Sequence, residues 1–329
     1  MSNYSWLQQR LHKIALSYQF MREVTFDVES SLMLPNESID NHVFVAGLAR
    51  SGTTILLNAL YESNEFSSLS YQDMPFILAP NLWSKLSFIK KDMDLVERAH
   101  GDGVKVSIGS PEAFEEVFWM TFNDDYEDTK ERFKTYVQLV NRKYQKDRYL
   151  SKNNQNIKRL ELISKLFPHS KILIPFRNPI QHAHSLLMQH KRFIEDSKKD
   201  KFISDYMKWI GHTEFGPNYI PIYNKNLNFK NDLEINHWLE QWYLTYKTCF
   251  DNLKDKNNVK FICYEQLCNS KEAWLNILQA LDIKGTYYFA FKESKKEIAF
   301  EVDKEINSEA LSLYSNLFKF TQRSANVIL

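Results

Sequence analysis

Apolar residues gather in five short runs that are separated by longer, more polar stretches. Short apolar runs bounded by polar residues are typical of strands that are covered on both faces. The runs lie near residues 42–46, 66–70, 148–152, 171–176 and 258–264. Several are followed by segments whose apolar positions recur every three or four residues, as on one face of a helix. These predicted helices cover residues 53–62, 155–167 and 179–193.

Strands that alternate with helices need crossover connections, which predicts a largely parallel sheet. We therefore expect an α/β protein with three layers, in which helices cover both faces of a mainly parallel central sheet. Pro175 lies inside the fourth apolar run. Because proline has no N–H group for the sheet ladder, we expect this strand to end early or to have an unpaired side there.

Two long segments, 71–147 and 194–256, separate these units and are rich in aromatic and charged residues. They are too long for simple connections, so we expect them to be insertions that cover a substrate site. The order of the motifs described below favours one domain over residues 1–329. Its core is expected to comprise about 41–70 and 148–285.

The overall charge is nearly balanced, with 42 basic and 41 acidic residues. There is no broad field to attract nucleic acid or an anionic membrane, so any anion site must be local. The three cysteines, Cys249, Cys263 and Cys268, have no metal-type spacing. Free thiols in a reducing compartment are the simplest interpretation.

The first residues lack the apolar centre of a signal peptide, and no apolar run reaches the ~18 residues of a membrane span. We therefore expect a soluble, cytoplasmic protein. Leu7, Leu11, Ile14 and Tyr18 share one helical face. We expect this face to pack on the body of the chain, with weak peripheral contact to a membrane or a partner as the alternative.

Residues 42–57 carry the most informative motif, in which a strand runs through a glycine-containing turn into a helix. Backbone N–H groups in such a turn and the positive end of the helix hold an anion. Gly47 and Gly52 keep the glycine spacing of a nucleotide-binding P-loop, but Thr53 stands where that loop has lysine. The cation inside this loop is Arg50.

A second motif lies in residues 171–185, where an apolar run ends at Arg177. Asn178 can cap the following helix, and Pro179 suits its first position. Ser185 follows two turns later. Arginine binds phosphate oxygens through two parallel hydrogen bonds, and a serine hydroxyl can donate another.

Together these motifs resemble those of the sulfotransferase family, which transfers a sulfuryl group from 3′-phosphoadenosine 5′-phosphosulfate (PAPS). The resemblance implies a P-loop-like fold, a bacterial-type member and a reaction that requires no metal. It also implies a sulfuryl contact by Lys152, in the segment 148–154. The late segment 259–267, with its Tyr-Glu-x-Leu pattern, is similar to another strand of the family. The donor-binding residues implied are Arg50, Ser51, Gly52, Thr53 and Thr54 for the 5′-phosphosulfate, and Arg177 and Ser185 for the 3′-phosphate.

The catalytic base has several candidates. Asp73 is the first, because it follows the strand near 66–70 and several sulfotransferases have a glutamate just after the equivalent strand. Glu112 is the second, although an acid in a first helical turn is favoured by the helix dipole in any case. Behind them stand Glu115 and Glu116, and also His182 and His184, which we expect to be packing or pocket-wall residues. Arg50 would stabilise charge on the departing phosphate oxygen.

The C-terminal Arg-Lys-Gly segment of the small-molecule branch is missing. A residue such as Lys191 or Arg192 would then complete the 3′-phosphate site. Segment 206–224 mixes aromatic and polar residues, which suits a carbohydrate or glycoconjugate acceptor. Two other functions stay open: a P-loop small-molecule kinase, which the missing lysine disfavours, and a non-catalytic nucleotide-binding protein.

Overall fold

A five-stranded parallel sheet forms the centre of the computed structural model, which describes residues 5–33, 40–86, 96–97, 105–106, 109–123, 127–199, 201–285, 287–292 and 301–326. The strand order is β2-β5-β1-β6-β7. A separate antiparallel pair joins β3 and β4. The strands are β1 (Val43–Val45), β2 (Phe66–Ser67), β3 (Val96–Glu97), β4 (Lys105–Val106), β5 (Arg148–Lys152), β6 (Lys171–Phe176) and β7 (Val259–Cys263).

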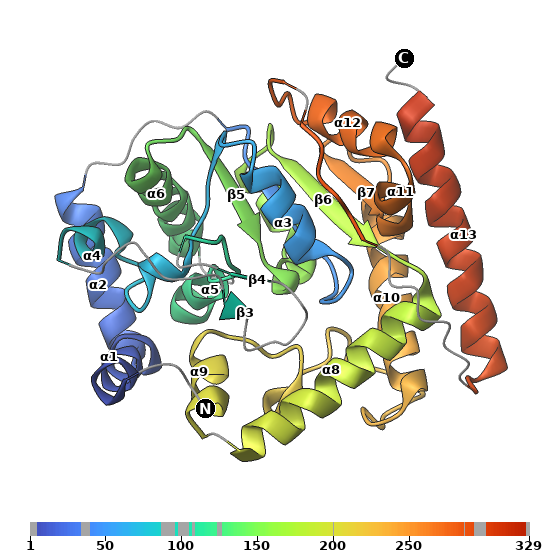
Figure 1. Ribbon diagram of the computed structural model, residues 1–329, viewed down its shortest axis with the longest axis horizontal. Coiled ribbons are helices and arrows are strands. Elements are labelled where there is room, and N and C mark those ends of the chain that lie inside the picture. The colour runs from blue at the N-terminus through green and yellow to red at the C-terminus, as the bar shows by residue number, and fades with distance from the viewer. Residues whose placement is uncertain are drawn as a thin grey trace.

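Helices lie around this sheet, and Figure 1 shows α13 along one side of the molecule and α1, α2 and α4 at the opposite end. They are α1 (Trp6–Ser17), α2 (Gln19–Leu32), α3 (Thr53–Tyr61), α4 (Pro80–Leu86), α5 (Glu116–Phe122), α6 (Glu127–Tyr144), α7 (Leu160–Leu166), α8 (Pro179–Lys199), α9 (Lys201–Trp209), α10 (Ile235–Leu253), α11 (Tyr264–Asn269), α12 (Lys271–Ala280) and α13 (Lys304–Asn326). Short 3₁₀ turns span Tyr71–Asp73, Asn154–Lys158 and Gly216–Asn218.

The two faces of the sheet have separate hydrophobic cores. Val43 and Val45 of β1 face one core, which also holds apolar side chains of α3, α11 and α12. Phe44 faces the other, which is larger and includes side chains of α2, α5, α6, α8, α10 and α13. This alternation along β1 is the period of two that a strand imposes. The prediction of an α/β fold with a parallel sheet between helical layers is confirmed.

The predicted strands are found at nearly the predicted bounds, although β2 is only two residues long. Strand β6 continues through Pro175, which pairs with Ile262 of β7. Strand β1 pairs with β6 only as far as Leu173, so Pro175 has no ladder partner on that side. The missing N–H group therefore falls on an unpaired side, as proline requires. The predicted helix 155–167 is divided into a 3₁₀ turn and α7.

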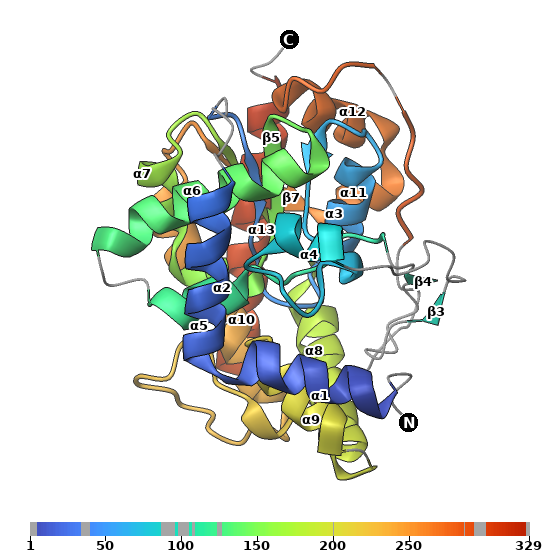
Figure 2. The same ribbon diagram turned by 90° about the vertical axis from the view of Figure 1, so that its left-hand side faces the viewer.

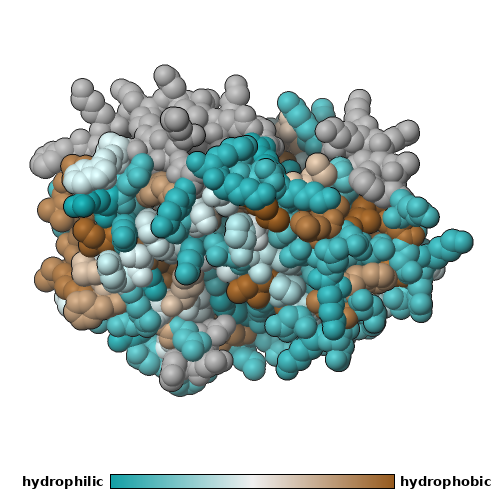
Figure 3. Space-filling model, turned by 90° about the horizontal axis from the view of Figure 1, so that it is seen from below, coloured by the Kyte–Doolittle hydropathy of each residue, from teal (hydrophilic) through white to brown (hydrophobic). Residues whose placement is uncertain are grey.

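The N-terminal helix packs through a different face from the predicted one. Leu7, Ile14 and Tyr18 are 70%, 47% and 55% exposed. The buried residues of α1 are His12, Ala15 and Leu16, and α1 contacts α2 and α9 (Figure 2). Figure 3 shows apolar surface at the end of the molecule where α1 and α2 lie. The expectation that the first face packs on the body is therefore wrong, because the neighbouring helices meet α1 from the other side.

Within the described ranges, no helix is both long enough and apolar enough to cross a bilayer. Among the described residues, Cys249, Cys263 and Cys268 form no disulfide. Burial raises the pKa of both Cys249 and Cys263 to about 12, so these two thiols stay protonated.

Candidate active site

The turn between β1 and α3 has the backbone geometry of an anion cradle. Arg50 and Gly52 both have positive φ angles, of 69° and 98°. The N–H and the hydroxyl of Ser51 both donate to the carbonyl of Leu48, at 3.2 and 2.7 Å. Ser51 therefore closes the turn from inside. The N–H groups of the first turn of α3, beginning at Thr53, have no partner within the helix and lie at its positive end.

His182 of α8 stabilises this turn through a hydrogen bond to its backbone. Its Nε2 donates to the carbonyl of Ala49 at 2.7 Å. Burial, together with the charges of Arg177 and Arg50, lowers the pKa of His182 to about 3. The ring is therefore neutral near pH 7, which agrees with the expectation of a packing role.

Both glycines of the motif are confined by their neighbours. A Cβ on Gly52 would lie 2.4 Å from Cδ2 of Tyr264, the first residue of α11. A Cβ on Gly47 would lie 3.1 Å from the carbonyl oxygen of Pro175 and 3.2 Å from Oγ of Ser51. The glycine spacing read from the sequence thus reflects close packing of the turn against β6 and α11.

The two predicted anion-binding motifs lie side by side. The Nε of Arg50 donates to the hydroxyl of Ser185 on α8 at 3.1 Å. Arg177 follows β6, and one of its Nη atoms donates to Gln181 at 3.3 Å. The Nε of Arg177 is buried and has no hydrogen-bond partner among the described residues. A half-buried arginine with a buried, unused N–H donor is suited to an anionic ligand.

Asn178 holds the start of α8 as predicted. Its side chain accepts from the N–H of Gln181 at 3.2 Å. Its own N–H donates to Glu265 of the Tyr-Glu-x-Leu segment at 2.7 Å. The acid of that segment therefore fixes the backbone beside Arg177.

One pocket brings together five of the predicted site residues. Its lining includes Arg50, Thr53, Thr54, Lys152 and Glu112. Lys152 is the last residue of β5 and is only 9% exposed. Segments 71–147 and 194–256, which were expected to be insertions, also contribute to the lining, with Tyr71, Phe114, Glu116, Tyr206, Ile210, Gly211, His212, Glu214 and Phe215.

Glu112 lies in this pocket with its carboxylate held from two sides. Its Oε2 accepts from the hydroxyl of Tyr71 at 2.9 Å, and its Oε1 accepts from the N–H of Ala113 at 2.9 Å. Its own N–H donates to the carbonyl of Leu69 at 2.9 Å. These bonds place a carboxylate among the same lining residues as Arg50 and Lys152.

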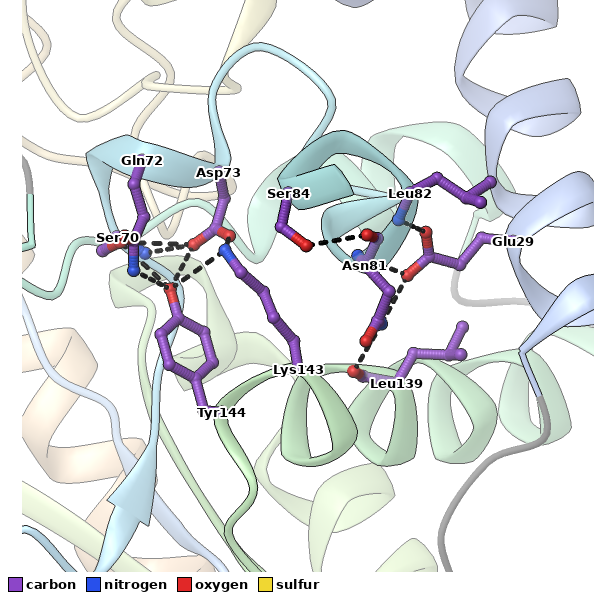
Figure 4. Close-up of polar contacts among 10 residues, drawn as sticks. All are labelled: Glu29, Ser70, Gln72, Asp73, Asn81, Leu82, Ser84, Leu139, Lys143 and Tyr144. Carbon is purple, nitrogen blue, oxygen red and sulfur yellow. Dashed lines mark hydrogen bonds and ion pairs between the residues drawn. The ribbon is translucent and has the colours of Figure 1, made fainter. Parts of the chain in front are cut away.

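Asp73 lies elsewhere, in a buried polar cluster drawn in Figure 4. It is fully buried and forms an ion pair with Lys143. Its Oδ2 accepts from the hydroxyl of Tyr144 at 2.6 Å and from the N–H of Ser70 at 2.7 Å. It is not among the residues that line the pocket of Arg50 and Lys152.

The remaining base candidates divide between core and pocket. Glu115 is 2% exposed and accepts from Trp119, Tyr149 and Asn156, so it is a core residue. Glu116 lines the pocket and pairs with Arg159 at 2.8 Å.

Burial raises the pKa of Glu116, and the hydrogen bond and charge of Arg159 oppose that rise. His184 is half-buried on α8, outside the pocket lining.

His212 and Glu214 are pocket residues that the sequence did not single out, although the aromatic and polar segment 206–224 contains them. Nδ1 of His212 lies 3.4 Å from a carboxylate oxygen of Glu214, and its ring stacks on Phe193 with a centroid distance of 5.3 Å. Gln155, which follows β5 closely, donates to the hydroxyl of Thr213 at 3.0 Å. The turn that follows Lys152 therefore holds this loop against the pocket.

Lys191 and Arg192 are exposed on α8, outside the pocket lining. Arg192 lies 3.5 Å from Asp196 on the same helix. Among the described residues, no group of three or more His, Cys, Asp or Glu side chains could hold a metal ion.

Three solved structures to which this chain is similar are sulfotransferases from bacteria. STF1 from Mycobacterium tuberculosis H37Rv aligns with 96% of this chain and 86% of its own at 9% identity and a TM-score of 0.49. STF9 from Mycobacterium avium aligns with 96% of this chain and 79% of its own at 12% identity and a TM-score of 0.45. The sulfotransferase from Alicyclobacillus acidocaldarius aligns with 87% of this chain and 96% of its own at 14% identity and a TM-score of 0.42.

A comparison with curated protein sequences finds no match. The model of the sulfotransferase family matches residues 42–286. This range begins at β1 and ends after α12, so it contains both predicted anion-binding motifs and all the residues that line the pocket of Arg50 and Lys152. The chain belongs to the sulfotransferase family.

Proposed function

We propose that this enzyme transfers a sulfuryl group from PAPS to a hydroxyl or amine of a carbohydrate or glycoconjugate acceptor. The observation that carries the proposal is one pocket lined by Arg50, the start of α3, Lys152 and Glu112. An anion cradle, a second cation and a carboxylate are the three elements that sulfuryl transfer to a hydroxyl needs.

The donor would bind across the two anion motifs. Its 5′-phosphosulfate would lie in the turn 50–54, on the N–H groups of α3 and the Arg50 guanidinium. Its 3′-phosphate would lie on Arg177 and Ser185. The buried, unpartnered Nε of Arg177 supports this assignment, as does the hydrogen bond that joins Arg50 to Ser185. In this arrangement one guanidinium is shared between the two ends of the nucleotide.

The reaction would proceed by in-line displacement at sulfur. The acceptor oxygen forms a bond to sulfur while the bond from sulfur to the 5′-phosphate oxygen breaks, and the electron pair stays on that oxygen. Arg50 and the α3 N–H groups stabilise the charge that develops there. Lys152 offsets the charge on the sulfuryl oxygens. The acceptor proton passes to a carboxylate.

Glu112 is the base that the geometry favours. It lines the same pocket as Lys152, whereas Asp73 is fully buried and its oxygens accept from Ser70 and Tyr144 and pair with Lys143. A base must reach the proton that it removes, and Asp73 would first have to break these contacts.

Support for a sugar acceptor comes from the pocket wall. Its lining combines the aromatic residues Tyr206 and Phe215 with the polar residues His212, Glu214 and Gln189, a mixture that suits a sugar. A kinase is disfavoured because Thr53 occupies the position of the P-loop lysine, and its hydroxyl donates to Asn154 at 3.3 Å.

Two measurements test the proposal. Calorimetry should show binding of 3′-phosphoadenosine 5′-phosphate and no binding of ATP with magnesium, and single-turnover assays with labelled PAPS should show transfer to saccharides. Lys152→Ala should lower the transfer rate roughly 10²–10³-fold and leave nucleotide affinity within a few-fold. The control Lys247→Ala removes an exposed lysine that pairs with Asp251 on α10, and it should change neither quantity.

Glu112→Gln should lower transfer without loss of nucleotide binding. Weakened binding with normal turnover in Lys152→Ala would contradict its assigned role. Binding of ATP with magnesium in place of the bisphosphate would favour the kinase. Nucleotide binding with no transfer to any acceptor would favour the non-catalytic alternative. Transfer to phenols but never to saccharides would refute the acceptor class.

A further inference from the structure

The buried cluster around Asp73 adjoins the segment that holds the proposed base. Asp73 is the last residue of the 3₁₀ turn Tyr71–Asp73, and its carboxylate accepts from the N–H and the hydroxyl of Ser70, which precedes that turn. Lys143 and Tyr144, at the end of α6, bind the same carboxylate (Figure 4). The turn is therefore tied to α6 by a buried ion pair and a hydrogen bond.

The same turn presents Tyr71 to the pocket. Its hydroxyl donates to Oε2 of Glu112 at 2.9 Å, and its ring packs edge-on against Phe114 with a centroid distance of 5.2 Å. The backbone repeats this connection, because Leu69 accepts from the N–H of Glu112 and Ser70 bridges to Pro111. Residues 69–71 thus hold Glu112 through its main chain and its side chain.

The cluster is shielded from solvent. Asp73 is 0% exposed, and the side chain of Lys143 is 9% exposed. Gln72 donates to the hydroxyl of Tyr144 at 3.1 Å. The neighbouring carboxylate, Glu29 of α2, accepts from the N–H groups of Asn81 and Leu82 at the start of α4. A buried charge pair of this kind fixes one conformation, since losing either partner leaves the other charge buried alone.

We propose that Asp73 and Lys143 are positioning residues. Their ion pair fixes the turn that carries Tyr71, and the hydrogen bond from Tyr71 then orients the carboxylate of Glu112 toward the acceptor. This rests on the proposed role of Glu112 as base. The hydroxyl of Tyr71 donates to the ionised form of that carboxylate, which favours the charged state that a base needs. The aspartate after β2 thus acts through its neighbour and not on the proton itself.

The test compares Tyr71→Phe, Asp73→Asn and Glu112→Gln in the full chain. Tyr71→Phe and Asp73→Asn should each lower kcat roughly 10–100-fold, the scale of a misplaced catalytic group, with unchanged affinity for 3′-phosphoadenosine 5′-phosphate. Both should move the acid limb of the kcat profile to higher pH. The double variant Tyr71→Phe with Asp73→Asn should be no slower than the slower of these two single variants, because both changes remove the same support of Glu112.

Two further measurements keep the test decisive. Asp73→Asn leaves the Lys143 charge without its partner and can weaken folding. The double variant Asp73→Asn with Lys143→Met removes both charges and is measured as a control. It should show the same shift of the acid limb of the kcat profile. The pKa of Glu112, from carboxyl-group titration of each variant against Glu112→Gln, needs no turnover and should rise in both. The other titratable groups that line the pocket and could affect this value are Arg50, Tyr71, Lys152, Glu116, Tyr206, His212 and Glu214.

Three outcomes would overturn the inference. An unchanged Glu112 pKa and acid limb in a folded Asp73→Asn protein would make Asp73 merely structural. Loss of transfer in Asp73→Asn with near-normal rates in Glu112→Gln would make Asp73 the base. If the Glu112 pKa rises in Tyr71→Phe and is unchanged in Asp73→Asn, Tyr71 orients Glu112 without help from Asp73. Failure of the wild-type protein to transfer sulfuryl groups would refute the proposed function, and the pKa measurement would still decide the positioning.

Discussion

Replacing Gly52 with alanine should destabilise the protein and weaken its nucleotide site. Gly52 has a φ of 98°, in the left-handed region that a side chain disfavours. A Cβ there would also lie 2.4 and 2.7 Å from two carbons of the Tyr264 ring. That ring is 6% exposed, and its hydroxyl donates to the carbonyl of Lys292 at 3.1 Å. The added methyl group therefore meets a side chain that is held at both ends.

The loss of unfolding free energy in Gly52→Ala has two separate contributions. A left-handed backbone costs an alanine about 1–2 kcal/mol relative to glycine. Forcing a buried ring out of its place costs about 1–3 kcal/mol more. Gly285 supplies the matched control, because its φ is 88° and an added Cβ would meet no atom of the described residues within 4 Å. Gly285→Ala should therefore show the backbone cost alone.

Urea unfolding of both variants measures the difference. Gly52→Ala should lose about 2–5 kcal/mol of unfolding free energy and Gly285→Ala about 1–2 kcal/mol. Calorimetry should show weaker binding of 3′-phosphoadenosine 5′-phosphate to Gly52→Ala only. In a Tyr264→Ala background the extra cost of Gly52→Ala should disappear, because the ring that it meets is gone. Equal losses in the two glycine variants would refute the reasoning, because displacing the Tyr264 ring would then require no free energy.

Two further predictions concern buried charge. Burial lowers the pKa of His42 to about 4 and that of His182 to about 3, whereas the unfolded chain takes up these protons near pH 6.5. The unfolding free energy should therefore fall by about 2 kcal/mol per histidine ring between pH 7 and pH 5. Urea titrations should show a smaller fall for His42→Leu than for the wild-type protein, and an equal fall would contradict the prediction. Arg159→Met should cost about 3 kcal/mol, the low end for a buried pair, because it removes the charged partner of the largely buried Glu116 and leaves that carboxylate with the hydrogen bond from Asn153. Adding Glu116→Gln should restore much of that loss, and no recovery would count against the ion pair.

The parallel sheet could be predicted from the sequence, and the two motifs expected to bind anions could be located there. Apolar runs predicted the strands, and the spacing of Gly47 and Gly52 predicted the turn after β1. Arg177 was located at the end of an apolar run, and its spacing to Ser185 resembles that of the sulfotransferase family. These features are local, because an anion site at the start of a helix is built from consecutive backbone N–H groups and a few side chains within two turns.

Which carboxylate lines the pocket depends on how distant segments pack and could not be predicted from the sequence. From its place after β2, Asp73 was expected at the site. The chain instead forms a 3₁₀ turn there, and the carboxylate is bound by Ser70 and by Lys143 and Tyr144, which are distant along the chain. Glu112 and His212 line the pocket from two segments, 71–147 and 194–256, that are far apart along the chain. The surroundings of a buried charge are set by segments that meet only when the chain packs, and no spacing along the sequence encodes that meeting.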